Sequence, residues 1–313
     1  MTPRPSLRLG AVVIGSLVVL LGATPSVASA APMGDREMKI RMIDQLPAAP
    51  QVLLLGSSRV LKYSPIDIAQ VSSHSAFNAG VSSGRPVDAW KYLTHTRSRF
   101  PNDMPHLVWG IEVEQFRPMP GEPGAAPLQP TPSVSAGAPT QPLTRWVNTS
   151  GDRFTGRGFR EWDFHDRAFV AAGNNRRSQA PILRRRMREQ ILDYRQRVYN
   201  GTAYRELSPY AKGYTVHVLR LANEQGDEPV IFLSPTHDIA RRDLGPRGFT
   251  ARRRDLLAWL ASLQRNDGLR FTVIDLTAVS TFRGVAADFY DGIHMRVANT
   301  RRVLSELNRR EQL

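Results

Sequence analysis

The hydrophobic pattern of the chain alternates between short apolar runs and longer amphipathic segments. The apolar runs are short and bounded by turn residues, which predicts buried strands over 52–55, 75–80, 106–113, 229–235 and 271–276. The segments around them carry apolar residues at helical spacing, which predicts helices over 36–45, 88–100, 180–201, 214–224, 250–264 and 298–309. Five strands that alternate with helices indicate an α/β fold, a doubly wound five-stranded parallel sheet.

One long segment breaks this alternation after the third strand. Residues 117–143 are rich in Pro, Gly, Ala and Ser, so we interpret them as a flexible loop. Residues 144–180 are polar and irregular in pattern, with scattered aromatic side chains. The aromatics either form a stacking platform for sugars or pin the segment to the body of the domain. We therefore treat 117–180 as an insertion in a single domain that spans 31–313.

The first thirty residues have the pattern of a secretory signal peptide. Arg4 and Arg8 precede an apolar run, and "ASA" at 28–30 offers a cleavage site before Ala31. We expect an exported, extracytoplasmic protein, located in the cell envelope or secreted. The alternative is an uncleaved N-terminal membrane anchor, although the apolar run is short for a membrane span. The chain has no cysteine, which excludes disulfides and a lipoprotein anchor.

The charge of the chain narrows the choice of partners. The formal net charge is +14 at pH 7, and much of it is arginine, as in "RRRMREQ" at 184–190 within the predicted helix 180–201. A basic exported protein is attracted to anionic envelope polymers or lipid head groups, and export argues against nucleic acid as a partner. The same arginines also suit a helix face that is merely solvated.

Ligands of open parallel sheets bind beyond the carboxyl ends of the strands, so the residues that follow each strand are the candidates for chemistry. Ser57 and Ser58 follow the first strand in "GSSR" at 56–59. Asp291 and His294 stand three residues apart in "DGIH", before the last helix. That spacing allows a carboxylate to orient an imidazole, which then activates a serine hydroxyl. An unrelated surface Asp and His is the simpler alternative.

Four segments, taken in order, resemble the SGNH or GDSL-type hydrolase superfamily: "GSSR", "FNAGVSSG" at 77–84, "VWGIEV" at 108–113 and "DGIH". The resemblance implies a flavodoxin-like sheet of the SGNH-hydrolase type. It also implies that Ser58 is the nucleophile, His294 the base and Asp291 its orienting acid, while Ser57 stands where the family has Asp. The Gly-Ser-Ser version resembles envelope branches of the superfamily that are tied to alginate acetylation or teichoic-acid D-alanylation.

The resemblance also points to an oxyanion site, where the chain departs from the family pattern. The candidate donors are the backbone N–H groups of Ser58, Gly80, Ser83 and Gly84. The family places an Asn side chain at the end of the third strand, but this chain has Glu112 there. An ionised Glu accepts hydrogen bonds without donating any, so it would repel an oxyanion. Three explanations fit a Glu at this position: another group donates to the oxyanion, catalysis is weak, or the site binds a ligand without catalysis.

Two further residues are candidates for substrate binding together with Glu112. Arg59 follows Ser58 and either donates to the oxyanion or is a solvated arginine at the start of a helix. His237 in "SPTHD", at the end of the fourth strand, either contacts substrate or bonds a loop carbonyl.

We expect an exported serine esterase or acyl-transfer enzyme that acts on esters, with O-acyl groups of envelope polysaccharide as the substrate. The alternatives are a non-catalytic glycan-binding protein of the same fold and an accessory protein of a membrane acyltransferase. No metal-binding, phosphate-binding or dinucleotide motif is present, so no metal, nucleotide or other cofactor is expected.

Overall fold

The computed structural model describes residues 33–122, 145–173, 175–201, 204–310 and 313. The proposed signal peptide and most of the Pro/Gly-rich loop therefore lie outside the described residues. No helix within the described ranges is long and apolar enough to cross a membrane.

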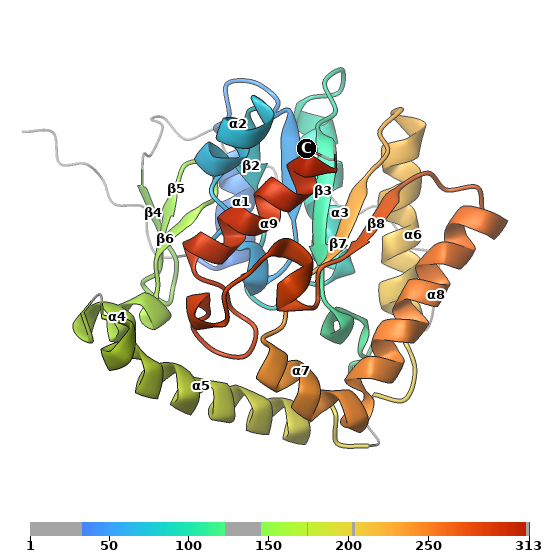
Figure 1. Ribbon diagram of the computed structural model, residues 1–313. Coiled ribbons are helices and arrows are strands. Elements are labelled where there is room, and N and C mark those ends of the chain that lie inside the picture. The colour runs from blue at the N-terminus through green and yellow to red at the C-terminus, as the bar shows by residue number, and fades with distance from the viewer. Residues whose placement is uncertain (1–32, 123–144, 174, 202–203, 311–312) are drawn as a thin grey trace, which may run out of the picture.

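A five-stranded parallel sheet forms the centre of the domain (Figure 1). Its strands are β1 (Val52–Leu55), β2 (Ala76–Asn78), β3 (His106–Ile111), β7 (Val230–Leu233) and β8 (Thr272–Asp275). They run in the order β2-β1-β3-β7-β8, and each neighbouring pair is parallel. This is the flavodoxin-like order, whose topological switch point lies between β1 and β3. The predicted fold class and all five predicted strands are confirmed.

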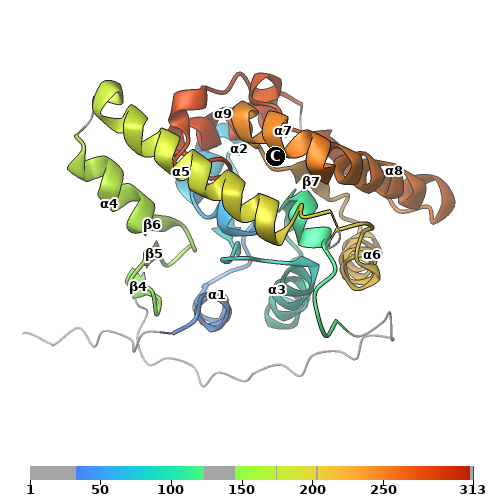
Figure 2. The same ribbon diagram turned by 90° about the horizontal axis from the view of Figure 1, so that it is seen from below.

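Helices cover both faces of this sheet (Figure 2). The described helices of ten or more residues are α1 (Asp35–Asp44), α3 (Pro86–Arg99), α5 (Arg176–Arg197), α6 (Pro209–Glu224), α8 (Thr250–Asn266) and α9 (Val297–Arg309). The shorter ones are α2 (Pro65–Ser72), α4 (Phe164–Ala171) and α7 (Asp238–Leu244). The six predicted helices are present with shifted ends. Helix α5 begins five residues before Pro181, because Asn175 caps it by accepting the N–H of Arg177.

Successive residues of each strand enter two different hydrophobic cores. Leu53 and Leu55 of β1 pack with side chains from α1, α3, α6 and α8. Val52 and Leu54 pack on the other face with side chains from α2 and α9. Because both faces are buried, β1 and β7 are apolar throughout, which is why the sequence marks them so clearly.

The expectation of irregular structure over 144–180 is wrong. Residues 145–171 form a three-stranded antiparallel sheet, β4 (Arg145–Val147), β5 (Arg153–Thr155) and β6 (Arg160–Trp162), followed by α4. Trp146, Phe154 and Phe169 are buried, so these three aromatics pin the insertion rather than offer a sugar-stacking platform. Strands of three residues are too short to show an alternating pattern, which is why the sequence did not reveal them.

The turn between β5 and β6 docks on the edge strand β2. The Asn78 N–H donates to the Arg157 carbonyl at 2.9 Å, and the buried ammonium of Lys39 donates to the carbonyls of Asn78 and Gly158. At Gly158, φ is +82° and a Cβ would lie 2.0 Å from the Asn78 carbonyl oxygen. Only glycine permits this close approach.

Candidate active site

The turn after β1 displays Ser58 at the carboxyl edge of the sheet. Gly56 has φ of +151°, and a Cβ there would lie 2.7 Å from the Gly110 carbonyl oxygen, so the turn requires glycine. Ser57 is buried, and its hydroxyl oxygen accepts the N–H of Arg59, which closes the turn around Ser58. Ser58 itself is only partly buried.

Ser58, His294 and Asp291 form one continuous hydrogen-bonded chain. The Ser58 Oγ lies 2.9 Å from His294 Nε2, and His294 Nδ1 lies 2.7 Å from Asp291 Oδ2. The other oxygen of the buried Asp291 accepts the N–H groups of Ile293 and His294, both at 2.8 Å. A carboxylate held in this way keeps the proton on Nδ1, so Nε2 can accept the serine proton.

Glu112 lies beside this group, at the start of the turn after β3. Ser57 donates its hydroxyl proton to Glu112 Oε1 at 2.6 Å, and Ser234 Oγ lies 3.4 Å from the same oxygen. The side chain is almost completely buried, and this burial raises the pKa of the Glu112 carboxyl to about 7. Both forms of the carboxyl are therefore accessible near neutral pH.

Arg59 is not a solvated arginine, and its guanidinium is already engaged. The side chain is buried and donates to Glu114 Oε2 at 2.9 Å, to the Tyr194 hydroxyl at 3.3 Å and to Thr236 Oγ1 at 3.4 Å. We therefore assign Arg59 to a buried ion pair next to the serine turn, instead of a donor to an oxyanion.

The turn after β2 offers fewer oxyanion donors than the sequence suggested. Gly80 already donates its N–H to Asn78 Oδ1 at 2.9 Å, and Gly84 donates to the Val81 carbonyl at 3.0 Å. Within the described residues, the N–H groups of Ser58 and Ser83 have no such acceptor. Ser83 also has φ of +53°, an uncommon conformation for a residue other than glycine. The expectation for Gly80 and Gly84 is thus corrected, while Ser58 and Ser83 stay as candidates.

His237 has a structural role instead of a place in the substrate site. Its Nδ1 accepts the N–H of Ile239 and so caps α7, and its ring packs edge-on against Phe289. Burial lowers the pKa of His237, which favours the neutral ring that this cap requires. Of the two roles expected for His237, the structure therefore favours hydrogen bonding within the loop over contact with substrate.

Helix α5 forms a wall of the site, which sequence reasoning missed. It runs across the carboxyl edge of the sheet (Figure 2). Met187 and Gln190 of α5 lie close to Gly292, which stands between Asp291 and His294 in the sequence. A Cβ at Gly292 would lie 3.4 Å from Met187 Sδ and 3.5 Å from Gln190 Cγ. Tyr194 contacts Arg59. The helical spacing of apolar residues in the sequence predicted a buried face on α5. It did not show which part of the protein that face packs against.

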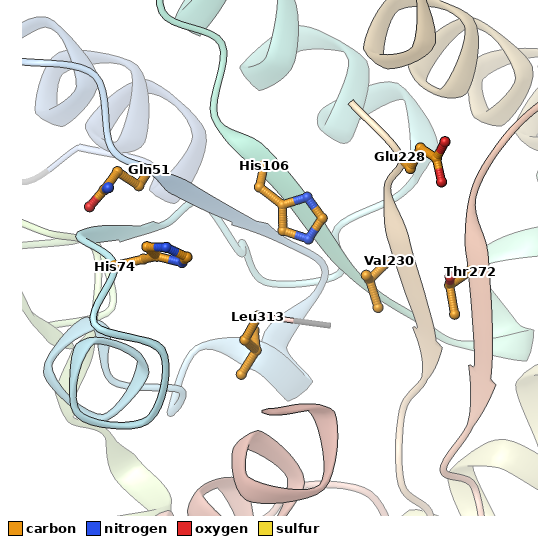
Figure 3. A pocket seen from close by; sticks show the side chains of 7 residues that line it. All are labelled: Gln51, His74, His106, Glu228, Val230, Thr272 and Leu313. Carbon is orange, nitrogen blue, oxygen red and sulfur yellow. The ribbon is translucent and has the colours of Figure 1, made fainter. Parts of the chain in front are cut away.

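A hollow of about 520 Å³ lies at the opposite edge of the sheet (Figure 3). It is lined by residues that precede or begin the strands: Gln51, His74, His106, Glu228, Val230 and Thr272, together with Leu313. Ligands of such sheets bind at the carboxyl edge, so this hollow is separate from the serine site. Among the described residues, no group of His, Cys, Asp and Glu is arranged to hold a metal ion.

The fold and the site together define an α/β protein of flavodoxin-like topology with a Ser-His-Asp constellation at its switch point. No protein-family model matches the chain, and no curated protein matches it.

Two solved structures are similar in fold. One is described as a "putative acylhydrolase" from Bacteroides fragilis, with 11% identity, a TM-score of 0.40, and coverage of 88% of this chain and 94% of its own. The other is a "GDSL-like lipase" from Bacteroides thetaiotaomicron, with 11% identity, a TM-score of 0.36, and coverage of 84% and 88%. Likenesses this distant carry no information on activity.

Proposed function

We propose that the protein is an exported serine esterase or acyl-transfer enzyme that acts on O-acyl groups of cell-envelope polysaccharide. The observation that carries the proposal is the contact of Ser58 Oγ with His294 Nε2 at 2.9 Å, with Asp291 behind the imidazole. A serine hydroxyl is a weak nucleophile until such a base accepts its proton.

The reaction begins when Ser58 Oγ attacks the ester carbonyl carbon while its proton passes to His294 Nε2. The tetrahedral intermediate then collapses, and the leaving alcohol takes that proton as the carbon–oxygen bond breaks. Asp291 stabilises the transient imidazolium. Water or an acceptor hydroxyl next attacks the acyl-serine with His294 again as base, which gives hydrolysis or acyl transfer.

The exposed surface of α5 supports an anionic polymer as the carrier of the ester. Arg177, Arg184 and Arg188 are exposed on one side of the helix, and within the described residues none of them forms an ion pair. The opposite side of the same helix packs on Gly292 and Arg59. A polyanion bound along these three arginines, which we call the α5 stripe, would be held on the same helix that borders the serine site.

The proposal is tested on the protein secreted from an expression host. We expect hydrolysis of p-nitrophenyl acetate, labelling by a serine-reactive fluorophosphonate, and loss of both in Ser58→Ala. Ser280→Ala removes an exposed serine outside the site and serves as the control. A wild-type protein that neither turns over the ester nor takes the label contradicts the proposal. Such a protein would favour the glycan-binding or acyltransferase-accessory alternative, which co-purification with a membrane acyltransferase tests.

Two further measurements examine compartment and substrate. N-terminal sequencing of the secreted protein should begin at Ala31 if the signal peptide is cleaved. Release of acyl groups from an O-acylated acidic polysaccharide should exceed release from a neutral one of equal acylation, because only the acidic polymer engages the α5 stripe.

A further inference from the structure

We infer that Glu112, in its neutral form, is the side-chain hydrogen-bond donor to the oxyanion formed at Ser58. This inference rests on the proposed esterase function and assigns a catalytic residue to it. The chain offers no asparagine at this position, and Arg59, the other side-chain donor that the sequence suggested, is held in an ion pair.

The register of the sheet places Glu112 next to Ser58. Leu55 of β1 pairs with Trp109 of β3, and Ser58 and Glu112 each lie three residues beyond this pair. The two turns are in contact, because a Cβ at Gly56 would lie 2.7 Å from the Gly110 carbonyl oxygen. Both side chains therefore begin at the β1–β3 switch point, where sheets of this topology bind ligands.

Two serine hydroxyls contact the same oxygen of Glu112. Ser57 donates to Oε1 at 2.6 Å, and the Ser57 oxygen itself accepts the N–H of Arg59 at 3.2 Å. Ser234 Oγ contacts the same Oε1. With Oε1 occupied as an acceptor, the proton of a neutral carboxyl resides on Oε2, and that O–H is the donor we assign to the oxyanion.

The groups around Glu112 shift its pKa in opposite directions. Burial and the carboxylate of Glu114 raise the pKa of Glu112, whereas Arg59, the Ser57 hydroxyl and His294 lower it. Tyr63 also faces Glu112, and burial keeps its phenol neutral by raising its pKa. The result is a carboxyl whose pKa is about 7, so it carries its proton at slightly acid pH. Negative charge on the oxyanion favours the protonated form further.

The assignment reconciles Glu112 with catalysis. An ionised Glu112 would repel the oxyanion, but a neutral carboxyl donates to it as an amide does. One donor of this kind contributes about 10²–10³ in kcat. No proton is transferred from Glu112 in the reaction, so atoms and charge balance as in the mechanism above.

The decisive experiment measures kcat/KM for p-nitrophenyl acetate from about pH 5 to pH 9. For the wild type we expect a decline above about pH 7 as Glu112 ionises, approaching tenfold per unit. Glu112→Gln keeps a donor that does not titrate, so it should keep activity within about tenfold at pH 6 and lose the alkaline decline. Glu112→Ala should lose about 10²–10³ at pH 6.

A matched control is Glu37→Gln on the exposed surface of α1, which removes a negative charge away from the site, so the alkaline decline should persist. The inference is overturned if Glu112→Gln is as inactive as Glu112→Ala, or if it keeps the wild-type decline. A carbon-13 NMR titration of wild-type Glu112 that gives an apparent pKa below about 5 also overturns it, whether or not the variants fold. Fluorophosphonate labelling of Ser58 distinguishes failure of this inference from failure of the proposed esterase function. If the wild type is active and labelled but Glu112 gives one of these contradicting results, only the inference on Glu112 is refuted.

Discussion

The Arg59 guanidinium donates a hydrogen bond to the Tyr194 hydroxyl at 3.3 Å, which links the serine turn to helix α5, the helix that begins at the end of the insertion. The same guanidinium pairs with Glu114 at 2.9 Å, and both side chains are largely buried. Three segments that are far apart in the sequence thus meet behind Ser58. Helix α5 is therefore a part of the active-site wall.

Removal of this arginine should destabilise the fold. Arg59→Met leaves Glu114 without its buried partner, and we expect the free energy of unfolding to fall by about 3–5 kcal/mol. Arg185→Met breaks an exposed ion pair with Glu189 and should cost less than about 1 kcal/mol. Urea unfolding measures both. Equal effects of the two substitutions would contradict the assignment of Arg59 to a structural ion pair.

The orientation of the imidazole by Asp291 predicts a large effect on rate. Asp291→Asn removes the acceptor that keeps the His294 proton on Nδ1, so kcat for an ester substrate should fall by about 10⁴-fold. Asp275→Asn, which changes a carboxylate at the end of β8, serves as the control for the loss of one charge. A tenfold loss or less in Asp291→Asn would mean that Asp291 does not orient the catalytic base.

The raised pKa of Glu112 also predicts a pH-dependent stability. The Glu112 pKa is about 7 in the folded chain, against an ordinary 4.5, so the folded chain retains a proton that the unfolded chain releases. The free energy of unfolding therefore falls as the pH rises from about 4.5 to about 7. Relative to wild type, Glu112→Gln should gain up to about 3 kcal/mol between pH 5 and pH 8. Glu37→Gln, on the exposed surface of α1, should show no such gain.

The close backbone contact at Gly158 predicts that alanine destabilises the protein at this position but not at a glycine with open space around it. Gly158→Ala would place a methyl group 2.0 Å from the Asn78 carbonyl oxygen at a positive φ, so the hairpin must move and stability should fall by about 2 kcal/mol or more. Gly213 lies within α6 with open space around it, and Gly213→Ala should stabilise by about 0.5–1 kcal/mol. Thermal melts compare them, and a neutral Gly158→Ala would contradict this docking of the hairpin.

The α5 stripe predicts a charge-dependent preference for polymers. Substitution of Arg177, Arg184 and Arg188 by Gln should weaken binding to an anionic polysaccharide and flatten its salt dependence, with little change in turnover of p-nitrophenyl acetate. A control triple of exposed arginines on other helices, Arg99, Arg220 and Arg265, removes equal charge. If both triples weaken binding equally, the attraction comes from net charge and not from the stripe.

The sequence by itself determined the five strands and the core helices. Burial on both faces makes the strands mainly apolar, and the helices carry a 3.6-residue period, so these elements are encoded locally. It also made Ser58, Asp291 and His294 the candidate site residues, through their places after a strand and before a helix and through the resemblance of their motifs to SGNH hydrolases. The short strands of the insertion carry no such local signal.

Only the tertiary structure decided what surrounds the serine. In the folded chain Glu112 accepts a hydrogen bond from Ser57, and Arg59 donates to Glu114 and Tyr194. The N–H groups of Gly80 and Gly84 donate within their own turn, so they are not available to an oxyanion. These outcomes depend on the register between strands and on contacts across large sequence separations. Hydrogen-bond geometry and burial set the protonation of Glu112, and neither is written in residue type or spacing.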